Sequence, residues 1–364
     1  MTATVDDTAE ARRLRVALAD ALAEKGDLTD PAWRKVFEAV PRHLFVPAFF
    51  TGPGEPVTAA DPDWLRTVYT DDVLVTQMTD GVATSSSTAP GLMLTMLHAL
   101  DVTAGASVLE VATGTGYNAA LLAERLGPAG RLTTIEVDPD LARTAEERLR
   151  ACGYTPLVLA GDGRAGHPDG APYDRLIATC GFHRLPYTWV EQVRPGGVIV
   201  TPLGSGTVRL DVGDGIASGS FLPTPSCFMG VRSAGETGTA PYPGDPETAG
   251  RRPTGLDPSA VSWTNAFPFL VSLVLPGVAT STDLDDDRRV TGCRLWTPDG
   301  SWARVDDGTV RQFGPRRLWD AVEAAHGWWE ENGRPERERF GIVLDREGQR
   351  LWLDEPGHLV PDFT

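Results

Sequence analysis

A short apolar run, a glycine-rich turn and a helical segment follow one another between positions 108 and 126. The apolar residues Val108, Leu109 and Val111 predict a buried parallel strand. Gly114 and Gly116 allow a tight turn in which the backbone approaches a ligand closely. The helix predicted next has N–H groups without partners in its first turn. The segment is therefore a candidate nucleotide-binding unit.

A second apolar strand is predicted over residues 131–138, with Glu136 near its C-terminal end. A carboxylate about 20 residues past the glycines is placed to accept hydrogen bonds from ribose hydroxyls. Further strands are predicted at 156–160, 173–179 and 194–201. This alternation predicts an α/β, Rossmann-like sheet.

Two cofactor classes are compatible with the unit. The spacing of Gly114, Gly116 and Ala119 satisfies the dinucleotide fingerprint, so a nicotinamide enzyme stays open on glycine spacing alone. S-adenosylmethionine is favoured by two carboxylates. Glu110 precedes the turn, where it would hold an ammonium group but repel a pyrophosphate, and Asp162 follows the strand at 156–160, where it could accept from an adenine amino group.

Net charge argues against two partner classes. The chain of 364 residues carries 33 basic and 50 acidic side chains, a formal net charge of −17, which argues against a general nucleic-acid or anionic-membrane binder. An acidic N-terminus and the lack of a long apolar stretch predict a cytoplasmic protein without a membrane anchor. Four scattered cysteines and six histidines show no metal-ligand spacing, so no metal is expected.

Before the first predicted strand of the sheet the chain is mainly helical. Residues 8–25 are amphipathic, and Asp30 followed by Pro31 predicts the start of a second helix. His43 lies between two prolines and is interpreted as a structural residue. The hydroxyl-rich segment 84–88 precedes a helix predicted at 92–100. One of its residues is expected to cap that helix, and the others are placed to hydrogen-bond a carboxylate at the mouth of the cofactor site.

Four segments together resemble the protein-L-isoaspartate O-methyltransferase family. They are 40–47 (Val-Pro-Arg-His-Leu-Phe-Val-Pro), 87–90 (Ser-Thr-Ala-Pro), 110–117 (Glu-Val-Ala-Thr-Gly-Thr-Gly-Tyr) and 161–163 (Gly-Asp-Gly). The resemblance covers roughly residues 8–222. It implies an S-adenosylmethionine-dependent enzyme that methylates a carboxylate of a protein or peptide.

The resemblance also assigns residues to roles. It places Thr88 where the family has its active-site serine, and Ala112 where the family has the first glycine of the cofactor loop. The substrate is expected to contact Arg42, Val75, Ser85 and Thr88. The cofactor is expected to contact Ser86, Ser87, Glu110, Ala112, Thr113, Gly114, Thr115, Gly116, Asn118, Glu136, Val137, Gly161, Asp162, Gly163 and Thr179.

The last third of the chain differs in character. Residues 223–258 include a long stretch rich in Gly, Pro, Thr and Ser and are predicted to form a linker. Beyond them we expect an apolar buried element at 266–275, a hairpin at 294–305, a helix at 316–332 and a second hairpin at 339–354. The predicted domains are 1–75 (helical cap), 76–222 (Rossmann-like core) and 259–364 (α+β peptide-recognition module).

The appended C-terminal part, and within it the segments 281–285, 295–302 and 314–319, resembles the methyltransferases paired with ATP-grasp ligases in the maturation of graspetides, which are crosslinked ribosomal peptides. That resemblance implies a modified precursor peptide as partner, a methyl ester on an ordinary aspartate, and an aspartimide as the next product. Lanthipeptide- and lasso-peptide-associated relatives are alternatives, as is the isoaspartate repair enzyme. The enzyme is expected to be a monomer. A peptide-binding scaffold with a vestigial cofactor site is the competing class.

Overall fold

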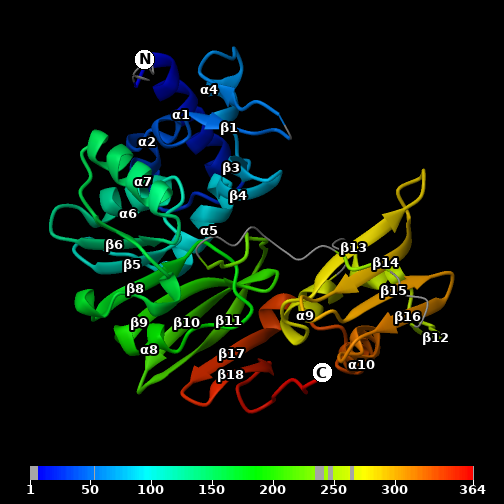
Figure 1. Ribbon diagram of the computed structural model, residues 1–364. Helices are drawn as coiled ribbons and strands as arrows, with labels where there is room; N and C mark the ends of the chain where they lie inside the picture. Colours follow the sequence, from blue (N-terminus) through cyan, green and yellow to red (C-terminus); the bar gives the residue numbers. More distant parts are fainter. Residues whose placement is uncertain (1–6, 53, 234–241, 245–248, 263–265, 364) are drawn as a thin grey trace.

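The computed structural model describes residues 7–52, 54–233, 242–244, 249–262 and 266–363 (Figure 1). The helices are α1 (Ala9–Glu24), α2 (Pro31–Ala39), α3 (Arg42–Phe45), α4 (Trp64–Val68), α5 (Pro90–Leu100), α6 (Tyr117–Leu126), α7 (Pro139–Ala151), α8 (Thr188–Gln192), α9 (Phe267–Val274) and α10 (Leu318–Glu331).

The first eleven strands are β1 (Ala48–Phe49), β2 (Val57–Thr58), β3 (Leu74–Thr79), β4 (Val82–Ser87), β5 (Ser107–Val111), β6 (Arg131–Glu136), β7 (Leu157–Ala160), β8 (Tyr173–Ala178), β9 (Val193–Leu203), β10 (Gly206–Gly213) and β11 (Ile216–Pro225). The others are β12 (Gly250–Pro253), β13 (Ala279–Leu284), β14 (Val290–Trp296), β15 (Trp302–Asp306), β16 (Thr309–Phe313), β17 (Phe340–Asp345) and β18 (Gly348–Leu353).

Nine strands form the main sheet, in the order β18-β17-β11-β10-β9-β8-β5-β6-β7. The strands from β7 to β9 pair in parallel, and those from β9 to β18 pair antiparallel. The predicted Rossmann-like α/β fold is confirmed. Antiparallel strands extend it on one side.

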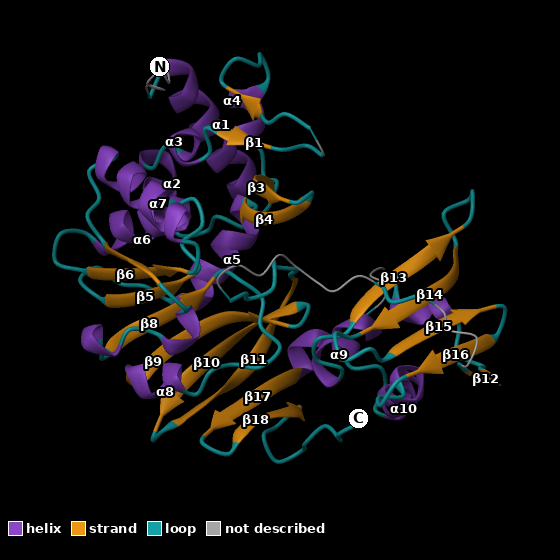
Figure 2. Cartoon of the chain, in the orientation of Figure 1, coloured by secondary structure: helices purple, strands orange, loops and turns teal. Residues whose placement is uncertain are grey.

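Side chains of β5 alternate between two cores, as expected for a strand buried on both faces. Val108 packs with α1, α2, α5 and α6, whereas Leu109 and Val111 belong to the core that contains α8, α9 and α10. Figure 2 shows the N-terminal helices gathered around the parallel end of the sheet. The main sheet therefore separates two hydrophobic cores.

The N-terminal helices begin as the sequence predicts. Asp30 caps α2 by accepting from the Ala32 N–H at 2.8 Å, and Pro31 occupies the first turn. His43 is fully buried, and its Nδ1 lies 2.7 Å from the Tyr69 hydroxyl. Its structural interpretation is consistent with this contact. No helix among the described residues is long and apolar enough to cross a membrane.

A second sheet of five strands, β12-β16-β15-β14-β13, lies beyond α9 and projects from the main body (Figure 1). The hairpin predicted at 294–305 is β14 paired with β15, and Trp296 faces Trp302 across it. The helix predicted at 316–332 is α10. Both local predictions are confirmed.

The domain boundaries need one correction at the C-terminus. The hairpin β17–β18 does not join the second sheet, because β17 pairs antiparallel with β11 of the main sheet. The sequence shows this hairpin but not its partner, which is more than a hundred residues away. The predicted module 259–364 therefore contains one segment of the core fold. The other boundaries remain predictions.

Candidate functional site

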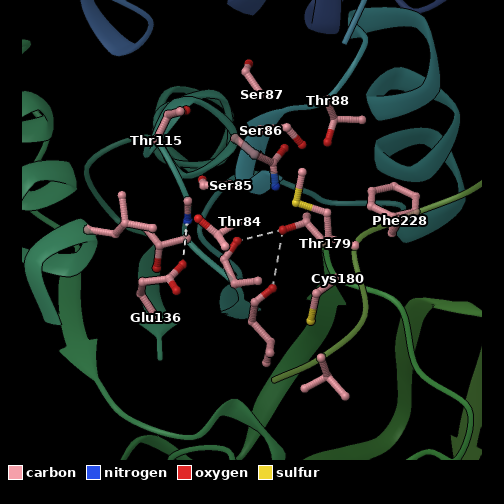
Figure 3. A pocket seen from close by; sticks show the side chains of 18 of the residues that line it. Thr84, Ser85, Ser86, Ser87, Thr88, Thr115, Glu136, Thr179, Cys180 and Phe228 are labelled. Atoms are coloured by element: carbon pink, nitrogen blue, oxygen red, sulfur yellow. Dashed lines mark hydrogen bonds between the residues drawn. The ribbon is translucent and has the colours of Figure 1, made fainter. Parts of the chain in front are cut away.

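A cavity of about 460 Å³ opens where β5, β6 and β8 end. This is the usual ligand position in an open α/β sheet, outside the carboxyl ends of the strands. Its size falls in the range of small-molecule sites. Figure 3 shows the hydroxyl residues 84–88 together with Glu136, Thr179 and Phe228, which also line the cavity.

Most of the predicted site residues line this cavity. They are Val75, Ser85, Ser86, Ser87, Thr88, Ala112, Thr113, Gly114, Thr115, Asn118, Glu136, Val137, Asp162, Gly163 and Thr179. Arg42, Glu110, Gly116 and Gly161 are not among the lining residues.

The turn after β5 needs left-handed backbone at three positions. Ala112, Gly114 and Gly116 have φ values of +72°, +54° and +86°. A side chain at Gly116 would also place its Cβ 3.2 Å from the Ala145 Cβ. Ala112 adopts this conformation despite its methyl group, at a cost of about 1 kcal/mol. Thr179 Oγ1 donates to the Ala112 carbonyl at 2.6 Å and helps to hold the turn.

Glu136 ends β6 and lines the cavity with a nearly buried carboxylate. Its oxygens accept from the Gly114 N–H at 2.8 Å and the Asp138 N–H at 3.2 Å. Burial raises the pKa of Glu136, and the Gly114 hydrogen bond opposes that rise. Glu136 thus links the end of β6 to the glycine turn.

Glu110 lies beneath the turn, not on the cavity wall. Its side chain is fully buried and accepts from Asn118 Nδ2 at 2.7 Å and from the Thr134 hydroxyl at 2.6 Å. Burial raises the pKa of Glu110 to about 7. Direct contact with an ammonium group does not follow from this geometry, because the carboxylate is fully buried and is not part of the cavity wall.

Asn118 connects Glu110 to the cavity. It lines the cavity, is 8% exposed, and its Oδ1 has no hydrogen-bond partner among the described residues. A buried acceptor without a partner is costly unless a ligand donates to it. The geometry therefore favours Asn118, oriented by Glu110, as the acceptor for an amine.

Asp162 follows β7, as predicted, and lines the cavity. It also binds Arg164, whose Nε lies 3.0 and 2.9 Å from the two carboxylate oxygens. The Arg164 hydrogen bond lowers the pKa of Asp162, so this acid stays ionised. Asp162 accepts from the Arg164 backbone N–H as well, at 2.9 Å.

The hydroxyl residues are not needed as helix caps. Residues 84–87 form part of strand β4, and the N-cap of α5 is Ala89, which makes no side-chain cap. The expected hydroxyl cap is wrong because Asp71, from a distant segment, accepts from the Gly91 N–H at 2.7 Å. Capping therefore does not account for the hydroxyl residues.

Ser86 and Thr88 are the two hydroxyls best placed to meet a ligand. Both are half-buried and line the cavity, and neither side-chain hydroxyl has a hydrogen-bond partner among the residues described. In contrast, Thr84 donates to Gln77 Oε1 at 2.8 Å, and Ser85 accepts from Thr76 at 3.3 Å. Thr84 and Ser85 thus bond to residues of β3, whereas the hydroxyls of Ser86 and Thr88 are left for a ligand.

Arg42 has a different position from the one expected of a substrate-binding residue. It is fully buried and donates to the carbonyls of Val68 and Thr70 at 2.9 Å and of Thr88 at 3.2 Å. Its guanidinium group holds the segment before the cavity in place, and it is not on the wall. The expected contact with substrate is corrected accordingly.

One wall of the cavity was missed by the sequence analysis. Residues 227–232, within the predicted linker, line it beside Cys180. Gly181 donates to the Met229 carbonyl and accepts from the Val231 N–H, both at 2.7 Å. Arg232 donates to the Thr84 carbonyl at 2.5 Å. The apolar residues Phe228, Met229 and Val231 were the available indication of a packed segment.

Cys180 does not provide a nucleophile for this site. Burial raises the pKa of its thiol to about 12, so the thiol stays protonated at neutral pH. The site therefore offers hydroxyls, amides and carboxylates.

Comparison with known proteins places this arrangement in a family. Residues 13–221 match the family described as protein-L-isoaspartate (D-aspartate) O-methyltransferase. The protein-L-isoaspartate O-methyltransferase of Ignicoccus hospitalis is 40% identical over 165 residues, which are 45% of this chain and 69% of that protein. The enzyme of the same name from Methanopyrus kandleri is 35% identical over 195 residues, covering 53% and 78%.

The fold comparison extends further along the chain. A solved protein-L-isoaspartate O-methyltransferase aligns with a TM-score of 0.57 and 21% identity, covering 94% of this chain and 100% of the other. The likeness in fold therefore includes most of the C-terminal third. With the family match over more than half of its length, the chain belongs to the protein-L-isoaspartate O-methyltransferase family and is an S-adenosylmethionine-dependent carboxyl O-methyltransferase.

Proposed function

We propose that the chain methylates the carboxylate of an isoaspartyl residue in a protein or peptide. The observation that carries the proposal is that Ser86 and Thr88 line the same cavity as the glycine turn and Glu136. The names of the relatives support the isoaspartyl substrate.

The cavity is suited to S-adenosylmethionine in three respects. Gly114 leaves its part of the cavity wall without a side chain, Asn118 offers an acceptor for the ammonium group, and Glu136 offers carboxylate oxygen to ribose hydroxyls. The cofactor, when bound, supplies an electrophilic methyl group on a sulfonium sulfur. Buried acceptors on both sides of the turn favour a ligand with several N–H and O–H donors.

The acceptor needs orientation more than it needs a base. An aspartyl-type carboxylate has a pKa near 3.9 and is ionised at neutral pH, so no proton has to be removed. Thr88 and Ser86 orient its oxygen by donating hydrogen bonds. Correct positioning contributes up to about 7–11 kcal/mol in favourable cases. Neutral hydroxyl donors leave the carboxylate more nucleophilic than a bidentate guanidinium would.

A second candidate is methylation of an ordinary aspartate in a crosslinked ribosomal peptide of the graspetide type. Two residues favour it. Compared with the serine and the glycine that the family resemblance leads us to expect, Thr88 adds a methyl group at the cavity mouth and Ala112 adds one at a strained position of the turn. In that reaction the next backbone amide nitrogen displaces methanol from the ester, giving an aspartimide. Lanthipeptide and lasso peptide precursors belong to the same substrate class.

Kinetics with three peptides distinguish the candidates. The peptides are an isoaspartyl peptide, its aspartyl isomer, and an aspartyl peptide closed by a side-chain ester. The proposal predicts the highest kcat/KM for the isoaspartyl peptide. A higher value for the crosslinked peptide would reject the repair-type assignment and select the second candidate. A catalytically silent chain that still binds a peptide would instead indicate a scaffold.

A further inference from the structure

The hairpin of β3 and β4 alternates between residue pairs on two faces. Leu74 and Ser87 pair across it, and each is only 4% exposed. Successive residues of a strand point to opposite faces, so the next pair, Val75 and Ser86, points the other way. Both members of this pair are half-buried and line the cavity. This face of the hairpin therefore belongs to the wall of the site.

Val73 is the cross-strand neighbour of Thr88 on this face. Continued by one residue, the register that pairs Leu74 with Ser87 sets Val73 opposite Thr88. Residues directly opposite each other in an antiparallel pair have their Cβ atoms about 4.5–5.5 Å apart. Val73 and Thr88 both line the cavity. Each of the two hydroxyls proposed to orient the carboxylate thus has a valine beside it.

A buried arginine holds Val73 in this position. Arg42 Nη2 donates to the carbonyls of Asp72 and Thr88, at 3.0 and 3.2 Å. Its Nη1 donates to two carbonyls of the segment 68–70, both at 2.9 Å. One guanidinium group therefore ties the residue before Val73 to the residue opposite it. The spacing of Val73 and Thr88 is accordingly built into the fold.

Val73 has a large apolar side chain that is open to water. It is 53% exposed, and among the exposed large apolar side chains of the described residues it alone lines the cavity. Removing apolar surface from water is favourable roughly in proportion to its area. A ligand that covers Val73 with an apolar group is therefore favoured over one that covers it with a polar group of the same shape.

Val73 lies at the end of the cavity where the substrate carboxylate is proposed to bind. Leu92, in the first turn of α5, also lines the cavity and adds apolar surface shortly after Thr88. Glu136, which offers its carboxylate to the ribose, lies well apart from Thr88 in Figure 3. The apolar groups beside Thr88 are therefore placed to contact the substrate rather than the ribose.

An isoaspartyl substrate brings one neighbouring residue close to Val73. Its free carboxylate is carried by the α-carbon, whose nitrogen is joined directly to the preceding residue. The following residue is joined through the side chain, which adds one methylene group to the connection. Consecutive α-carbons are about 3.8 Å apart across a trans peptide bond, a distance close to the spacing of opposed side chains in the hairpin. A carboxylate at Thr88 therefore sets the preceding residue within reach of Val73.

We propose that Val73 selects substrates in which the residue directly before the methylated isoaspartyl residue has an apolar side chain. The inference rests on the proposed function, because it takes the ligand to be an isoaspartyl peptide whose carboxylate binds at Thr88. The contact takes no part in methyl transfer, so it changes KM more than kcat. Val73 thus discriminates among isoaspartyl sites that share the same reactive group.

Selectivity is measured with the full chain, S-adenosylmethionine and isoaspartyl peptides that differ at one position. The preceding residue is methionine or glutamine, which have nearly the same shape but differ in polarity. A second pair of peptides carries the same two residues directly after the isoaspartyl residue.

At the preceding position, we expect kcat/KM for methionine to exceed that for glutamine about three- to tenfold, as expected for a partly buried apolar contact. The difference should lie mainly in KM. At the following position the ratio should be smaller. Equal values for methionine and glutamine at the preceding position, or a larger ratio at the following position, would overturn the proposal.

Variants assign the selectivity to Val73. Val73→Ser removes both methyl groups and should lower the methionine-to-glutamine ratio below about twofold, whereas Val73→Ile should retain it. Val82→Ser is the matched control, because Val82 is a valine of the same hairpin that is 43% exposed and does not line the cavity. Its ratio should equal that of wild type. A ratio that survives Val73→Ser, or that falls equally in Val82→Ser, would contradict the proposal.

Two outcomes separate this inference from the proposed function. If all four peptides are methylated with equal kcat/KM, the proposed function stands and the role of Val73 fails. If none is methylated, the proposed function itself fails. S-adenosylhomocysteine affinity in Val73→Ser should stay within a factor of two or so of wild type. A large loss of that affinity would assign Val73 to the cofactor and overturn its role in substrate choice.

Discussion

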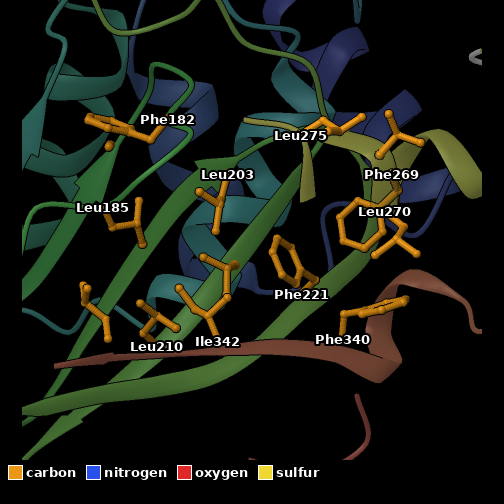
Figure 4. Close-up of a cluster of buried hydrophobic side chains, with 14 of the residues drawn as sticks. Phe182, Leu185, Leu203, Leu210, Phe221, Phe269, Leu270, Leu275, Phe340 and Ile342 are labelled. Carbon is orange, nitrogen blue, oxygen red and sulfur yellow. The ribbon is translucent and has the colours of Figure 1, made fainter. Parts of the chain in front are cut away.

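The two halves of the main sheet divide chemistry from support. In the parallel half, β5, β6 and β8 each end at the cavity. Ala112 and Thr179 come directly after β5 and β8, and Glu136 is the last residue of β6. In the antiparallel half, no cavity-lining residue comes from β10, β17 or β18. Figure 4 shows side chains of this half, among them Phe221, Phe340 and Ile342, packed with α9.

The difference follows from how each half is connected. Parallel strands need crossover helices, so their C-terminal ends all open toward one edge where loops can hold ligands. Antiparallel strands that follow one another, such as β9, β10 and β11, need only short turns. By contrast, β17 pairs with β11 although it lies far along the chain. The loops of the parallel half therefore hold the site, and the strands of the antiparallel half pack against α9 in the core.

The largest expected effect comes from removing the C-terminal hairpin. Deleting residues 340–364 takes away five buried side chains, those of Phe340, Ile342, Leu344, Trp352 and Leu353. At roughly 1.5–3 kcal/mol each, their burial matches the whole stability of a typical domain. We expect loss of cooperative thermal unfolding. Leu284→Ala, at an exposed position of β13, is the control and should unfold normally. A truncated chain with native cofactor affinity would contradict the division of roles.

Glu110 should make stability fall as pH rises. Its pKa is near 7 in the folded chain and near 4.3 when unfolded, so the native state holds the extra proton between these values. The free energy of unfolding should therefore decline from about pH 5 to pH 8, by an amount on the order of 3 kcal/mol. Glu110→Gln should flatten this decline, as measured by urea unfolding at several pH values. An identical slope in wild type and variant would refute the assignment.

Glu136 should control cofactor affinity. Glu136→Ala removes a hydrogen-bond acceptor for the ribose, which should weaken S-adenosylhomocysteine binding by roughly 1.5–3 kcal/mol in calorimetry. Because Glu136 also accepts from the Gly114 N–H, Glu136→Gln is the control that retains one carbonyl oxygen, and it should lose less. Native affinity in Glu136→Ala would show that Glu136 does not contribute to cofactor binding.

Thr88 should affect turnover rather than cofactor binding. Thr88→Val keeps the shape and removes the hydroxyl, so kcat should fall by about 10- to 100-fold, as expected for a hydrogen bond to a charged group. S-adenosylhomocysteine affinity should stay within a factor of two or so of wild type. Thr88→Ser should restore most of the rate. A proportional loss of melting temperature and activity would show that the hydroxyl is structural.

The smallest expected effect concerns the strained turn. Ala112→Gly relieves the methyl group at φ +72°, and should raise the free energy of unfolding by about 0.5–1 kcal/mol. Ala119→Gly, inside helix α6, is the matched control and should lower it by a similar amount. Destabilisation in both variants would mean that the Ala112 methyl group packs favourably.

Local patterns predicted the parallel half well. The strand with Val108, the glycines at 114 and 116, and Glu136 are close in sequence, so their geometry follows from a single β-α-β unit. Even the left-handed backbone at Ala112 follows from its place in the glycine turn. The short segment fixes both the fold and the position of the cavity.

What the sequence did not predict depends on distant contacts. Asp71 caps α5 and makes a hydroxyl cap unnecessary, Arg42 binds carbonyls 26 or more residues away, and residues 227–232 close the cavity from a supposed linker. Val73 comes to lie beside Thr88 only through the pairing of β3 with β4. No local period in the sequence reports such an alignment.

The most direct test of the account is methyl transfer itself. The full chain is incubated with S-adenosylmethionine labelled in its methyl group and an isoaspartyl peptide, with the matching asparaginyl peptide as control. The account predicts label in the isoaspartyl peptide alone, released as methanol by mild base, since a carboxyl methyl ester is base-labile. No label in the peptide, or label that resists mild base, would contradict a carboxyl methyltransferase acting on this substrate.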